Sequence, residues 1–194
     1  MRLFVAIDLS ASIRNSLAEQ IKDLESILDT RAIRWVKPSA MHLTLKFLGE
    51  TPDHKVERIQ STLADIAPRY SPFTMQIGTF GCFPNLRKPR VLWIGIQEQT
   101  GILKKLHREL EMEFRKLGFK AENRPFRAHL TLGRVKKNTH SKVLGTLRSQ
   151  LGDVRIEELG KETVEAICLI RSILRPTGAE YTQLGLYELT ARGK

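Results

Sequence analysis

Two closely similar segments, HLTLKFLGE at 42–50 and HLTLGRVKK at 129–137, lie 87 residues apart in this chain of 194 residues. Each follows a run of apolar and β-branched residues that is typical of a strand, RLFVAIDL at 2–9 and RVLWIGIQ at 90–97. Because both the segments and the runs before them recur at matching intervals, the sequence predicts a duplicated unit.

An amphipathic helix is predicted between the strand and the segment in each half, with Ser10 as the N-cap of the first and Gly118 ending the second. A shorter helix follows each segment, the first ending before Pro68 and the second at Gly152. Strands are predicted after these helices, FTMQIGTFGCF at 73–83 in the first half, and ETVEAICLIRSIL at 162–174 with YTQLGLYEL at 181–189 in the second. The apolar residues of the two longer helices recur every three or four positions, as one helix face requires: Ile13, Leu17, Ile21, Leu24 and Leu28, then Leu103, Leu106, Leu110, Phe114 and Leu117.

We therefore expect an α+β fold in which mainly antiparallel sheets line a central cleft and the helices lie outside. Residues 1–194 are expected to form a single bilobal domain with an internal pseudo-twofold repeat, approximately 1–89 and 90–194. The stretch PNLRKP at 84–89 is interpreted as the turn between the lobes.

Side chains alternate along a strand, so His42 and Thr44 share one face, as do His129 and Thr131. Two imidazoles with ordinary pKa values near 6.5 could act together, one neutral and accepting a proton, the other charged and donating one. The threonine hydroxyls could hydrogen-bond phosphate oxygens. A metal site is the less favoured interpretation, because two histidines fall short of the usual three or four ligands.

The composition indicates a soluble protein with a polyanionic partner. The net charge is +11, both halves are basic, and there are only two cysteines. Such a field attracts nucleic acid, although a merely solvated basic surface would have the same composition. The N-terminus lacks a signal peptide and no apolar run approaches 20 residues, so we expect a cytoplasmic protein with no membrane association. Basic residues cluster around the second segment, and Arg134 is the candidate substrate ligand among them: Lys120, Arg124, Arg127, Arg134, Lys136, Lys137 and Lys142.

Several other residues are interpreted as structural. His54 and His140 are expected to face solvent, and His107 to lie at the boundary of a helix face. Phe47 and Trp35 could stack on a base, but core packing is the favoured interpretation for both.

The sequence resembles the 2H phosphoesterases, and within them the bacterial and archaeal RNA 2′,3′-cyclic phosphodiesterases, historically called 2′-5′ RNA ligases. The residues that carry the resemblance span nearly the whole chain: MRLFVAIDL, MHLTLKFLGE, FPNLRKPRVLWIGI, FRAHLTLGRV and RSILRPTGAEYTQL. It implies a duplicated two-lobed fold, a metal-independent reaction without a cofactor, and an RNA end bearing a 2′,3′-cyclic phosphate as partner.

The resemblance also implies residue roles. His42 would protonate the leaving 3′ oxygen, His129 would deprotonate water, Thr44 and Thr131 would hold the phosphate, and a 2′-phosphate would form. Ala128 stands where relatives often have proline. Two alternatives remain: a 2′-5′ RNA ligase running related chemistry in reverse, and a non-catalytic basic RNA-binding module. We expect a monomer.

Overall fold

The computed structural model describes residues 1–175 and 178–191, so Pro176 and Thr177 of the RSILRPTGAEYTQL segment lie outside the described residues. Four α-helices and nine strands are described. In chain order they are β1 (Arg2–Ile7), α1 (Ala11–Ile27), β2 (Ile33–Trp35), β3 (Leu43–Glu50), α2 (Val56–Ile66), β4 (Phe73–Phe83), β5 (Val91–Gln97), α3 (Ile102–Lys116), β6 (His129–Val135), α4 (Ser141–Asp153), β7 (Gly160–Val164), β8 (Ala166–Arg175) and β9 (Gly178–Glu188).

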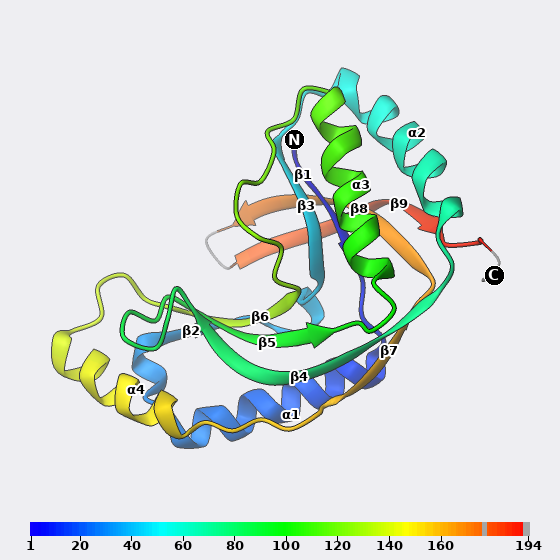
Figure 1. The fold of residues 1–194 in the computed structure, drawn as a ribbon. Coiled ribbons are helices and arrows are strands. Elements are labelled where there is room, and N and C mark those ends of the chain that lie inside the picture. Colours follow the sequence, from blue (N-terminus) through cyan, green and yellow to red (C-terminus); the bar gives the residue numbers. More distant parts are fainter. Residues whose placement is uncertain (176–177, 192–194) are drawn as a thin grey trace.

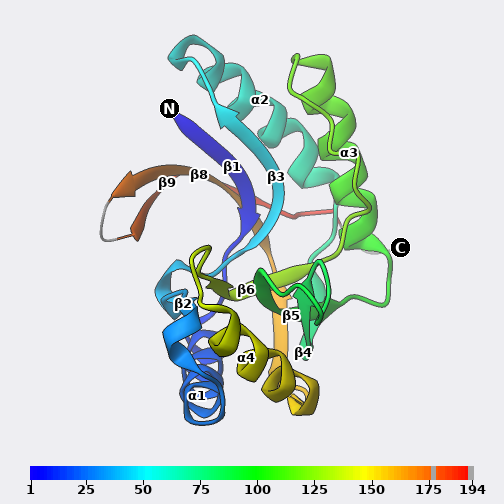
Figure 2. The ribbon, with the colours of Figure 1, turned by 90° about the vertical axis from the view of Figure 1, so that its left-hand side faces the viewer.

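The strands form two antiparallel sheets, one of four strands in the order β3-β1-β8-β9 and one of five in the order β2-β6-β5-β4-β7. Helices α2 and α3 cover the outside of the first sheet, and α1 and α4 cover the outside of the second (Figures 1 and 2). The predicted α+β class, with antiparallel sheets inside and helices outside, is confirmed.

Each sheet draws its strands from both halves of the sequence, which the sequence analysis did not foresee. Strand β1 pairs with β8, and β4 pairs with β5. Helix α1 follows β1 in the chain but packs against β7 of the other sheet, while α3 follows β5 and packs against β3. The predicted turn at 84–89 is the tip of the β4–β5 hairpin, which lies within one sheet.

The predicted helix signals are confirmed. The Ser10 hydroxyl accepts the backbone N–H of Ile13 and donates to Glu162 Oε2, so it both caps α1 and ties it to β7. Gly118 has a φ of +82°, the left-handed conformation that ends α3. The run ETVEAICLIRSIL, predicted as one strand, is divided at Glu165 into β7 and β8, which belong to different sheets.

One continuous apolar core joins both sheets to their helices, and it contains the leucines of both HLTL segments. A smaller cluster lies on the opposite face of the four-stranded sheet and consists of Phe4, Ala6, Cys168 and Ile170. Within the described residues, no helix is both long enough and apolar enough to cross a membrane.

A buried ion pair fastens α3 to β3. Lys46, only 3% exposed, donates from Nζ to Glu111 Oε2 and to the carbonyl oxygen of Lys120, both at 2.7 Å. Glu111 also accepts the backbone N–H of Glu122. The pair therefore anchors the segment that leads from α3 to the second HLTL segment.

We predict that Glu111→Ala lowers the free energy of unfolding by about 3–5 kcal/mol, because it leaves a buried ammonium without its counterion. The double variant Lys46→Met, Glu111→Leu should lose far less. Lys116→Ala, which breaks an exposed pair with Glu113, is the control and should cost at most about 1 kcal/mol. Urea denaturation measures all three, and a small loss for Glu111→Ala would contradict the anchoring role.

Candidate active site between the two sheets

The first HLTL segment directs its polar residues to the face of the four-stranded sheet that the helices leave uncovered. Thr44 pairs with Ala6, and Phe47 pairs with Phe4. Thr44 and Phe47 are three residues apart, but they lie on the same face because β3 contains a bulge between them. His42, two residues before Thr44, lies on the same face.

Aromatic rings surround His42. Its imidazole stacks on Phe4, with ring centroids 4.5 Å apart, and meets the edge of Tyr181 at 5.1 Å. Tyr181 comes from β9, near the opposite end of the chain. The His42 ring thus lies between residues from the first and last strands.

The second segment is arranged in the same way on β6. A bulge in β6 lets Arg134 fall on the face of His129 and Thr131, although strict alternation would put it on the other side. Their partners on β5 alternate regularly and so define that face: Gly95, Trp93 and Val91. Arg134 therefore occupies the position on β6 that Phe47 occupies on β3.

The tautomer of neutral His129 is fixed by its backbone. Its Nδ1 lies 2.6 Å from the carbonyl oxygen of Arg127, which can only accept, so Nδ1 carries the proton and Nε2 keeps a free lone pair. Phe83 and Trp93 meet the ring at 5.0 and 6.3 Å between centroids. His42 makes the equivalent hydrogen bond to the backbone of Ala40, also two residues earlier.

The two sheets approach each other at these segments, because β3 contacts β6. Tyr181, which touches His42, lies within electrostatic range of Arg134, and Arg134 lies within electrostatic range of His129. The five residues singled out from the sequence thus belong to two equivalent groups, His42 with Thr44 and His129 with Thr131 and Arg134, on the sides of the sheets that face each other.

The charged neighbours of the two histidines differ. Burial lowers the pKa of His42 to about 4. Its hydrogen bond to Ala40 and the Asp8 carboxylate raise this pKa, and the Arg14 guanidinium, which is paired with Asp8, lowers it. Burial also lowers the pKa of His129, and the Arg134 guanidinium lowers it further. His42 thus has both a carboxylate and a guanidinium as charged neighbours, and Asp8 has the larger effect of the two, whereas the charged neighbour of His129 is a guanidinium.

Arg14 holds the turn before His42 in place. Its Nη1 donates to the carbonyl oxygens of Pro38 and Met41 at 2.7 and 3.1 Å, and its Nη2 pairs with Asp8. Since α1 carries Arg14 beneath the five-stranded sheet, this side chain links that sheet to the His42 segment.

Most of the structural interpretations are confirmed. His54 and His140 are exposed, His107 is half-buried and stacks on Phe126 at 3.9 Å, and Trp35 packs against the core. Phe47 is the exception: it is 63% exposed, so its assignment to the core is wrong. The bulge in β3 is the reason, because it turns Phe47 away from the helices.

Sequence reasoning missed Phe4, Tyr181, Asp8 and Arg14. A signal for the first was present: FVAI at 4–7 and WIGI at 93–96 share the pattern aromatic, apolar, small, apolar. In both copies the aromatic residue contacts the histidine of the segment paired with it. Nothing local in the sequence connects Tyr181 with His42.

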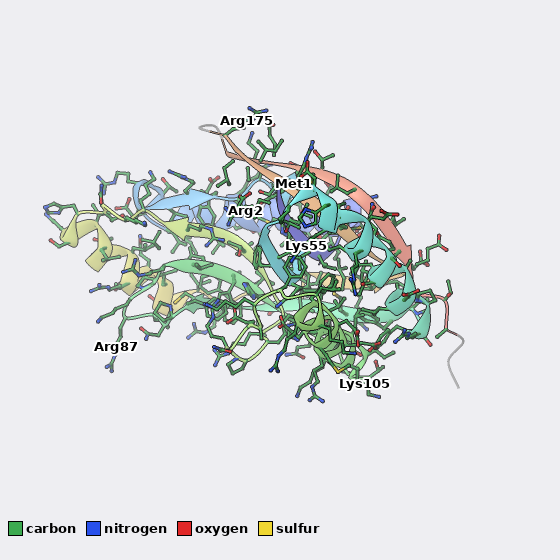
Figure 3. All side chains as sticks on the ribbon, turned by 90° about the horizontal axis from the view of Figure 1, so that it is seen from above. Met1, Arg2, Lys55, Arg87, Lys105 and Arg175 are labelled. Carbon is green, nitrogen blue, oxygen red and sulfur yellow. The ribbon has the colours of Figure 1, made fainter. Side chains whose placement is uncertain are left out.

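No three metal-ligating side chains gather anywhere in the part of the chain that the structure describes. The basic residues near the second segment are mostly exposed, but Arg124 pairs with Glu122 at 2.8 Å. Figure 3 shows that other cations, such as Lys55, Lys105, Arg87 and Arg175, are spread over both sheets and their helices.

The profile of the LigT like Phosphoesterase family matches residues 7–93 and again 94–181. The chain is 36% identical over 189 residues to the RNA 2′,3′-cyclic phosphodiesterase of Methanothermobacter thermautotrophicus, covering 97% of this chain and 99% of that protein. It is 37% identical to the protein of the same name from Archaeoglobus fulgidus, covering 97% and 100%. The chain therefore belongs to the LigT-like phosphoesterase family.

Solved structures of other proteins share the fold of this chain. A protein of Thermus thermophilus superposes with a TM-score of 0.82 at 28% identity over the full length of both chains. Escherichia coli LigT, solved with 3′-AMP, gives a TM-score of 0.78 at 27% identity over 98% of each chain.

We predict that the free energy of unfolding falls as the pH is lowered from about 6.5 to 4. The folded state holds the pKa of His42 and of His129 below the usual value, so the unfolded chain binds more protons in this window. Urea denaturation at several pH values should show a shallower slope for His42→Gln. The exposed His54→Gln is the matched control, and equal slopes for both variants would contradict the prediction.

Proposed function

We propose that this chain is an RNA 2′,3′-cyclic phosphodiesterase that opens the cyclic phosphate to a 2′-phosphate by acid and base catalysis from two histidines. The observation that carries the proposal is the pair of equivalent His-x-Thr groups on facing sheets, in a chain whose full-length relatives bear that name. RNA is also the partner that the net charge of +11 favours.

In the proposed reaction, His129 takes a proton from water through Nε2, and the water oxygen attacks phosphorus. The bond from phosphorus to O3′ breaks, and His42 gives its proton to that oxygen. The products are a 2′-phosphate and a free 3′-hydroxyl. The hydrogen bond from Nδ1 of His129 to Arg127 supports the base role, and the Asp8 carboxylate near His42 supports the acid role.

Thr44, Thr131 and Arg134 would hold the phosphate. The hydroxyls can donate to its non-bridging oxygens, and the guanidinium can offset the charge that grows on them in the transition state. A bound phosphate anion would also raise the pKa of the buried His42 towards the range where its imidazole can donate a proton at neutral pH. Substrate binding would thus prepare the acid.

The proposal also covers domain organisation, location and cofactor requirement. Residues 1–194 act as one bilobal domain, the protein works as a cytoplasmic monomer, and the reaction needs neither metal nor cofactor.

The decisive experiment is hydrolysis of a short RNA that ends in a 2′,3′-cyclic phosphate, with EDTA present and the 2′- and 3′-phosphate products resolved. We expect conversion to the 2′-phosphate, with a bell-shaped pH dependence from one protonated and one neutral imidazole. Adding an RNA with a 5′-hydroxyl end tests the ligase alternative. Ligation faster than hydrolysis, or binding without turnover, would overturn the proposal.

His42→Ala and His129→Ala should each lower kcat by about 10²–10⁴-fold with little change in RNA affinity. The double variant should lose little more than the worse single variant, because the two groups act in one step. His54→Ala is the control and should retain full turnover. Circular dichroism checks that each variant folds. Retained turnover in either single variant would exclude a mechanism that needs both histidines.

A further inference from the structure

A second arginine lies directly beside Arg134. Arg34 on β2 is the cross-strand partner of Arg134 on β6. Residues directly opposite each other in an antiparallel pair share one face of the sheet. Arg34 is therefore on the face of Arg134, Thr131 and His129, while its neighbours Ile33 and Trp35 pack on the other side against the core.

Both arginines lack an acidic partner. Each is exposed, and among the described residues no carboxylate lies within ion-pair distance of either. Like charges directly opposite on neighbouring strands destabilise a sheet. By contrast, Arg31 and Arg124 each have a carboxylate two residues away. A bound external anion would therefore reduce the repulsion between the two guanidinium groups.

One phosphate does not account for both arginines. Arg134 shares a face with His129 and lies within electrostatic range of it, so in the proposed reaction it would lie beside the phosphate that reacts. A cyclic phosphodiester carries a single negative charge, and the neighbouring strand lies about 5 Å further out. Strand β2 is also the outer edge of its sheet, and none of the described strands pairs with its free side. A polyanion leaving the site over this edge would bring its next charge to Arg34.

We propose that Arg34 binds the phosphodiester on the 5′ side of the terminal nucleoside, so that the site takes an RNA strand in preference to a cyclic mononucleotide. This inference rests on the function proposed above, and it adds the class of substrate. Arg134 would hold the phosphate that reacts, and Arg34 would hold the next one along the strand.

Three substrates test the proposal: a 2′,3′-cyclic mononucleotide, a dinucleotide ending in a 2′,3′-cyclic phosphate, and the same dinucleotide with a neutral methylphosphonate linkage. We expect Arg34→Gln to lower kcat/KM for the normal dinucleotide by about tenfold, mainly through KM, because a hydrogen bond to a charged group is lost. Turnover of the cyclic mononucleotide should not change.

The methylphosphonate dinucleotide completes a double-mutant cycle, because it removes the charge of the linkage while Arg34→Gln removes the charge of the side chain. For wild-type protein, kcat/KM should be about tenfold lower on this substrate than on the normal dinucleotide. Arg34→Gln should not lower kcat/KM on this substrate any further. Arg148→Gln, which removes an equal charge from α4, is the matched control and should leave kcat/KM unchanged for all three substrates. Raising the salt concentration should weaken dinucleotide binding less steeply for Arg34→Gln than for wild type.

Two results would overturn the proposal. Equal losses on the mononucleotide and the dinucleotide would mean that Arg34 acts through fold or general charge, and no loss on the dinucleotide would mean that it does not contact the strand. If wild-type protein hydrolyses none of the three substrates, the proposed function itself fails, which is a different outcome from failure of the role of Arg34.

Discussion

The backbone pairing of β1 with β8 is the constraint on which the rest of the structure depends. It joins Arg2 to Ser172, 170 residues apart in the chain, and completes the sheet that carries His42. Together with the β4–β5 pairing, it makes each sheet from both halves of the sequence, so that neither half contains a complete sheet. Because such distant strands must meet before either sheet is complete, folding should be slow for a chain of this size.

The same pairing explains how a duplicated sequence produces an asymmetric site. Both copies place an imidazole against an aromatic ring and hydrogen-bond it to the backbone two residues earlier. Around this common arrangement the neighbours differ, since Asp8 with its partner Arg14 lies near His42 and Arg134 lies near His129. The proposed reaction needs one group that gives a proton and one that takes it, and the different neighbours of the two histidines are the asymmetry that the proposal uses.

Equivalent bulges in β3 and β6 each add one more residue to the sheet face that carries the histidine and the threonine. Each comes after the threonine and brings the residue three positions later onto the same face, Phe47 in one copy and Arg134 in the other. An exposed aromatic ring and a guanidinium therefore occupy related places on the two sheets. Arg34 continues the cationic side by one strand, towards the open edge of the five-stranded sheet.

The sequence by itself determined the α+β class, the duplicated elements, the helix caps and the candidate residues His42, Thr44, His129 and Thr131, because periodicity, capping and strand alternation are local properties. Only the tertiary structure decided which strands share a sheet, that Phe47 is exposed, and that Tyr181, Asp8 and Arg14 surround the His42 segment. Strand pairing over long distances and single-residue bulges leave no periodic trace in a sequence, so Tyr181, Asp8 and Arg14 could not be read from it as neighbours of the His42 segment.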